Sequence, residues 1–238
     1  MTIADKLTQI AERLPIVYDA GQDAGRMAEY DRFWDDFQKE GSRNAYQYAF
    51  INWNGEYIKP KYKIAPTKGG MPQMFYSNTK LKKIEAKYFD FSNLPAATYA
   101  GVDLYYTFQF CSNLEEIEDV GISANFFTGT FHGCNKLHTI AKLTVKETTT
   151  FSTDPFHSCT ALEEIRFEGV IGKSLDLHWS TKLSMLSLAS IVNALSKTAS
   201  GQSITLPTTA RQTYDNATFS GRWDELVAEY PNWSFKYS

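Results

Sequence analysis

The stretches that decide the fold are FQFCSNLEEI at residues 108–117, FHGCNKLHTI at 131–140 and FHSCTALEEI at 156–165, with a weaker copy, FYSNTKLKKI, at 75–84. All four share the pattern F-x5-L-x2-I, and the steps between their phenylalanines are 33, 23 and 25 residues. Similarity at a nearly fixed period indicates an internal repeat. The expected repeat core is Phe75, Leu81, Ile84, Phe108, Cys111, Leu114, Ile117, Phe131, Cys134, Leu137, Ile140, Phe156, Cys159, Leu162 and Ile165.

The three cysteines belong to this repeat. Cys111, Cys134 and Cys159 each follow a phenylalanine by three residues and precede a leucine by three, and no CxxC pair is present. We therefore interpret them as small buried apolar side chains, with no disulfide and no metal among them.

A unit of about 23 residues is too short to bury its own apolar face, so neighbouring copies must stack on one another. The L-x2-I core suits a short strand, and stacked copies place such strands in parallel, about 4.8 Å apart. We expect an α+β solenoid, with a degenerate last copy that starts at Trp179 and has Met185 and Leu188 at the leucine and isoleucine offsets.

The F-x2-C-x2-L-x2-I pattern resembles the BspA-type leucine-rich repeat of bacterial and protist surface proteins and of bacteriophage or prophage genes. The resemblance covers residues 71–188, about half of the chain. It implies a short leucine-rich-repeat solenoid, and it leaves the function open because this repeat serves many binding roles.

The two ends of such a stack need caps. Residues 71–183 are the expected solenoid and 184–238 an α/β cap, with a helix from Ser184 or Ser187 to Gly201, a second helix in WDELVAEY and a strand pair from QSITL and WSFKY. At the other end, aromatic runs flank Asn54-Gly55, which predicts a β-hairpin cap over residues 41–70.

Residues 1–40 form a helical segment of different character. Its apolar residues follow the alternating spacing of a coiled-coil seam, namely Ile3, Leu7, Ile10, Leu14 and Val17. Two readings remain open: self-association into a trimer or dimer, and packing on the chain's own cap. The segment IAERLPIVYDAGQDAGRMAEYDRFWDDFQ also resembles the opening of repeat proteins encoded in prophages of gut bacteria, which implies a tail- or virion-associated role.

Charge and hydropathy exclude several classes of protein. With 24 basic against 27 acidic residues among 238, no nucleic-acid footprint is expected. No apolar run reaches the roughly 20 residues of a membrane span, and Asp5 interrupts the start, where a signal peptide needs an apolar core. The expected location is the virion or the exterior after lysis, following synthesis in the host cytoplasm.

No catalytic constellation is found. Walker, GxGxxG, HExxH and GxSxG patterns are missing, and the pairs Glu115/Glu116 and Glu163/Glu164 are interpreted as solvated charges on opposite sides of a strand. A zinc site from the two H-x-C pairs is set aside in favour of a buried cysteine ladder. We predict no enzyme activity, catalytic residue, cofactor or metal. The candidate binding residues are Tyr99, Tyr105, Tyr106, His132, His157, His178 and Trp179.

The first functional hypothesis is a non-enzymatic phage or prophage particle protein that binds a host receptor or a neighbouring virion protein. The second is a bacterial surface adhesin for host protein or glycan, and the third is a tail-borne glycan hydrolase.

Overall fold

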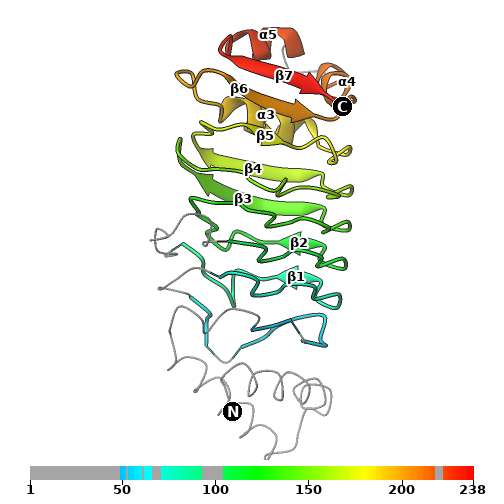
Figure 1. The fold of residues 1–238 in the computed structure, drawn as a ribbon. Helices are drawn as coiled ribbons and strands as arrows, with labels where there is room; N and C mark the ends of the chain where they lie inside the picture. Colours follow the sequence, from blue (N-terminus) through cyan, green and yellow to red (C-terminus); the bar gives the residue numbers. More distant parts are fainter. Residues whose placement is uncertain (1–48, 52, 61, 66–70, 93–103, 218–221) are drawn as a thin grey trace, which may run out of the picture.

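The isoleucines of the four repeat copies lie side by side in one parallel sheet. Its strands are β1 (Lys83–Ile84), β2 (Glu116–Ile117), β3 (Thr139–Val145) and β4 (Glu164–Gly169), in that order. Ile84 pairs with Ile117, Ile117 with Ile140 and Ile140 with Ile165, so corresponding residues meet across every strand pair. The computed structural model, shown in Figure 1, describes residues 49–51, 53–60, 62–65, 71–92, 104–217 and 222–238.

A second parallel sheet lies at the C-terminal end of the stack (Figure 1). It is formed by β5 (Leu175–Asp176), β6 (Gln202–Leu206) and β7 (Trp233–Tyr237), in this order. The helices are α3 (Met185–Asn193), α4 (Ala210–Asp215) and α5 (Trp223–Ala228). Within the described residues no helix has the length and apolar character needed to cross a membrane.

The phenylalanines form a continuous stack through the core. Their ring centroids follow one another at 5.3, 5.0, 5.7 and 5.5 Å, with interplanar angles of 5° to 20°. The members are Phe50, Phe75, Phe108, Phe131 and Phe156, each at most 1% exposed. Phe50 lies 25 residues before Phe75, in the segment that was expected to form a hairpin. The stack therefore begins one step earlier than the sequence pattern.

The cysteines run alongside this stack and tie each copy to the one before it. The thiol of Cys111 donates to the carbonyl oxygen of Phe75 at 3.0 Å, and Cys134 and Cys159 repeat the contact one and two copies later at 3.0 and 3.2 Å. In the first copy Asn78 replaces the cysteine, and its amide donates to the carbonyl of Phe50 at 2.7 Å. Burial is complete at all three cysteines, which are free thiols.

The last copy is shifted by two residues from its expected position. In the three copies before it, the cysteine N–H donates to the carbonyl of the phenylalanine three residues earlier, and Ser180 donates to Leu177 in the same way at 2.9 Å. Leu177, Ser180 and Leu183 therefore occupy the Phe, Cys and Leu offsets, and all are buried. The expectation that Trp179 starts this copy is wrong, because Trp179 is 37% exposed.

Helix α3 lies where a fifth strand would follow β4. Its N-cap is Ser184, whose hydroxyl accepts a hydrogen bond from the N–H of Ser187 at 3.2 Å. The side chain of Ser187 then accepts from the N–H of Ile165 at 2.9 Å, and that of Ser190 accepts from the N–H of Phe167 at 3.0 Å. Serine hydroxyls thus satisfy the N–H groups of Ile165 and Phe167 at the outer edge of β4, which leaves neither donor for pairing with another strand.

The caps differ in part from expectation. Helix α3 ends at Asn193 rather than at Gly201, and β6 and β7 pair as expected but in parallel, with β5 as a third strand and α4 as an additional helix. Among the described residues around Asn54-Gly55 no antiparallel pair is present, and Ile64 instead bridges Phe89 in parallel. The seam Ile3, Leu7, Ile10, Leu14 and Val17 lies outside the described residues, as does Tyr99.

Candidate functional site

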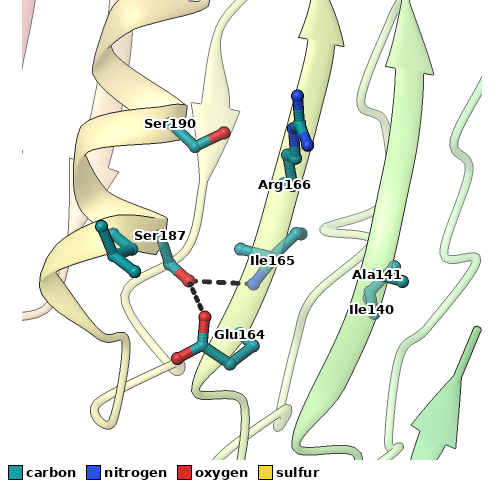
Figure 2. Close-up of a pocket in the computed structure, with 8 residues that line it drawn as sticks. Ile140, Ala141, Glu164, Ile165, Arg166, Ser187 and Ser190 are labelled. Atoms are coloured by element: carbon teal, nitrogen blue, oxygen red, sulfur yellow. Dashed lines mark hydrogen bonds between the residues drawn. The ribbon is translucent and has the colours of Figure 1, made fainter.

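A groove of about 420 Å³ opens on the outer face of the first sheet, beside α3 (Figure 2). Strands β3 and β4 contribute its floor and one wall, and the first two turns of α3 contribute the other wall. The volume lies within the range of small-ligand pockets. The lining residues are Ile140, Ala141, Glu164, Ile165, Arg166, Leu186, Ser187 and Ser190.

The groove results from the change from strand to helix in the last copy. Leu186 stands nine residues after Leu177, at the offset where the earlier copies carry a buried isoleucine. Because the chain is helical here, Leu186 is turned out of the core and is 69% exposed. A large apolar side chain is thereby displayed at the rim of the groove.

Two of the three basic side chains of the first sheet are paired with carboxylates. Lys83 contacts Glu118 at 2.6 Å and Glu116 at 3.0 Å. Lys142 on β3 likewise contacts two carboxylates, Asp119 just after β2 at 3.0 Å and Glu168 on β4 at 3.2 Å. The third basic residue of these strands is Arg166, and within the described part of the chain it forms no ion pair. Its guanidinium is exposed at the groove, with five N–H donors.

Two acidic residues of β4 lie two positions from Arg166, and both contact other groups. Glu168 contacts Lys142 at 3.2 Å. In Figure 2 the carboxylate of Glu164 points to the base of α3, where its Oε2 lies 3.4 Å from the hydroxyl of Ser187, whereas the guanidinium of Arg166 lies further along β4. Ser187 also donates to the carbonyl oxygen of Glu163 at 2.8 Å. Glu164 therefore lies at the base of the helix, apart from the guanidinium of Arg166.

A row of rings follows the turns of the repeat on another part of the surface. Tyr76, Phe110, His132, His157 and Trp179 contact one another in this order, with ring centroids 6.0, 5.4, 4.4 and 4.7 Å apart. The two histidine rings are nearly parallel, at 14°. The two histidines thus stack on each other, whereas Phe110 contacts His132 edge-on at 81° and Trp179 is tilted by 49° against His157.

Two of the three predicted histidines, His132 and His157, belong to this row of rings. His132, His157 and His178 share one repeat offset, immediately after the buried Phe or Leu. Burial lowers the pKa of His132, and the charge of His157 lowers it further. Nδ1 of His132 is buried and has no hydrogen-bond partner among the residues that the structure describes, which also favours the neutral ring.

An acidic group lies next to this row. Asp154, Asp176 and His178 have ligand-type atoms within 4.8 Å of one another, and in the described residues they are the only such group of three. Nδ1 of His178 lies 2.7 Å from Oδ1 of Asp176, which orients the imidazole. Burial raises the pKa of Asp154, and the charge of Asp176 raises it further. Neither the cysteines nor His132 and His157 belong to this group.

The other predicted binding residues are placed apart. The ring centroids of Tyr105 and Tyr106 lie 4.0 Å apart. The ring of Tyr106 also lies over Gly129, where an added Cβ atom would approach the ring to 2.3 Å. Sequence reasoning missed Phe110, which is 42% exposed, and it missed Arg166 and Leu186. The sequence offered one signal for Arg166, namely a charged residue directly after the repeat isoleucine Ile165 in the expected strand.

Comparison of the chain with protein-family models, with curated proteins and with solved structures found no match.

Proposed function

We propose that this chain is a non-enzymatic binding protein of a phage or prophage particle, built on a leucine-rich-repeat solenoid of the BspA type. In this proposal the solenoid binds a host surface receptor or a neighbouring virion protein. The observation that carries it is the in-register stacking of the repeat copies on one continuous core of phenylalanines and cysteines.

Such stacking favours binding because it fixes the exposed side chains before a partner arrives. Outward residues at one offset, such as Glu116, Thr139 and Glu164, lie opposite one another on adjacent strands. Each is held by an isoleucine neighbour that is at most 2% exposed. A surface that is ordered in advance loses less conformational entropy on association, so more of the contact energy remains as affinity.

The phage or prophage context is supported by the resemblance of the N-terminal segment to prophage-encoded repeat proteins. In this proposal residues 1–40 anchor the chain or join it into a trimer or dimer. Linking several solenoids in this way raises the avidity for a surface that carries repeated receptors, without any new contact.

Two measurements test this function. Antibody detection in purified phage particles and on intact uninfected cells separates a particle component from a surface adhesin. Binding of the labelled full chain to host cells and to particles lacking the protein then shows whether the partner is a host surface receptor or a neighbouring virion protein. Signal confined to uninfected cells would support the adhesin instead, and turnover on a glycan array would support the hydrolase.

A further inference from the structure

We propose that the groove between β4 and α3 binds an extended peptide segment of a protein partner through an acidic side chain on Arg166 and an adjacent apolar side chain against Leu186. This inference rests on the proposed binding function and specifies the chemistry that the partner must offer.

The charge pattern of the sheet points to an acidic residue. Lys83 and Lys142 each contact two carboxylates, so their charges are compensated within the chain. Arg166 forms no such contact in the described residues, although it is exposed on the same face. A planar guanidinium binds the carboxylate of an acidic side chain through two parallel hydrogen bonds.

The apolar part of the groove selects an apolar side chain next to the acidic residue of the peptide. Leu186 is 69% exposed at one wall, and Ala141 is exposed on the floor. A cavity of about 420 Å³ accepts a few side chains of a peptide. Binding energy at such sites comes from an apolar anchor that excludes water around a charged contact.

The groove must recognise the side chains of the partner peptide, because pairing with its main chain is blocked. The outer edge of β4 is occupied by Ser187 and Ser190, which accept hydrogen bonds from the N–H groups of Ile165 and Phe167. A peptide therefore cannot add to β4 as a further strand by main-chain pairing. The hydroxyl of Ser190 lines the groove, where it can donate its hydrogen to a peptide carbonyl and so orient the segment.

The test uses a positional library of N-acetylated, C-amidated nonapeptides, so that every carboxylate belongs to a side chain. The full chain is expected to select Asp or Glu with an apolar residue within two positions. Selected peptides labelled with fluorescein are then titrated by anisotropy. Arg166→Ala should weaken binding about 10- to 100-fold, and Leu186→Ser about tenfold. Arg166→Lys should restore part of the loss.

Lys146→Ala is the matched control, because it removes the same charge from an exposed residue outside the groove lining and should leave the affinity unchanged. Replacing the peptide's acid with its amide should cost as much as Arg166→Ala, and the two changes together should cost little more than either. Absence of any bound peptide, absence of an acidic preference or full affinity in Arg166→Ala would overturn the inference.

The results of these experiments distinguish an error in the groove assignment from an error in the proposed function. If Arg166→Ala and Leu186→Ser still bind particles or host cells normally, the groove assignment is wrong and the binding function stands. If the peptides bind as expected but neither particles nor cells bind the chain, the groove stands and the proposed function is wrong.

Discussion

Replacing Phe131 with leucine removes a ring that is stacked on both sides. Its centroid lies 5.7 Å from that of Phe108, 5.5 Å from that of Phe156 and 6.5 Å from that of Phe127, and the residue is fully buried. Each aromatic pair contributes about 0.5–1.5 kcal/mol beyond burial of area, and the change of shape adds about 1 kcal/mol. We expect the free energy of unfolding to fall by about 2.5–5.5 kcal/mol.

Two matched variants sharpen this prediction. Phe156 has one stacked phenylalanine partner against three for Phe131, so Phe156→Leu should cost about 1–3 kcal/mol less than Phe131→Leu. Phe110 is 42% exposed, so Phe110→Leu should cost less than about 1 kcal/mol. Urea denaturation followed by circular dichroism and tryptophan fluorescence gives the midpoints, compared at unchanged slope. If Phe131→Leu costs no more than Phe110→Leu, the stack does not stabilise the array.

Three further predictions concern the core, the acidic group and the sheet edge. Burial raises the pKa of Cys111 to about 12, so neither it nor the other thiols should react with Ellman's reagent at about pH 8, near the ordinary thiol pKa, until guanidinium unfolds the chain. Because the folded-state pKa of Asp154 is raised, its ionisation destabilises the fold as pH rises through that value. Asp154→Asn should therefore raise the melting temperature at neutral pH and by much less in acid, and an equal gain at both would contradict the reading. Ser187→Ala removes the acceptor for the N–H of Ile165 and should cost about 1–3 kcal/mol in the same urea assay; an unchanged midpoint would show that the helix does not satisfy this edge.

The sequence predicted the repeat core because Phe, Leu and Ile recur at fixed offsets, and every residue named for that core is buried. The sequence did not predict either end of the stack. The residue types at the repeat offsets change there, while the stacked arrangement of the copies continues. Phe50 keeps the ring but lacks the leucine and isoleucine that follow in other copies. In the last copy Leu177 and Ser180 replace Phe and Cys, and the nearby Trp179 offers a misleading aromatic match.

The candidate groove could not be predicted, because it depends on a change of secondary structure within a repeat. Leu186 occupies an offset that is buried in every strand copy, and only the helical path of α3 exposes it. The histidines were identified from their shared offset, but the other rings that His132 and His157 contact come from a different offset. Phe110 and Trp179 follow the buried residue by two positions rather than one, so no single alignment column contains the row.

Parallel stacking of the copies in one register is tested most directly by spin labels at corresponding offsets. Cysteines introduced at Lys83 and Thr139 in one variant, and at Glu116 and Glu164 in another, would each carry labels two strands apart, about 10 Å between their backbones. The buried native thiols should remain unlabelled, which single-label controls check. Stacked repeats predict strong and similar dipolar broadening of the electron paramagnetic resonance spectrum in both pairs. A spectrum in either pair that equals the sum of its single-label spectra would contradict the stacking.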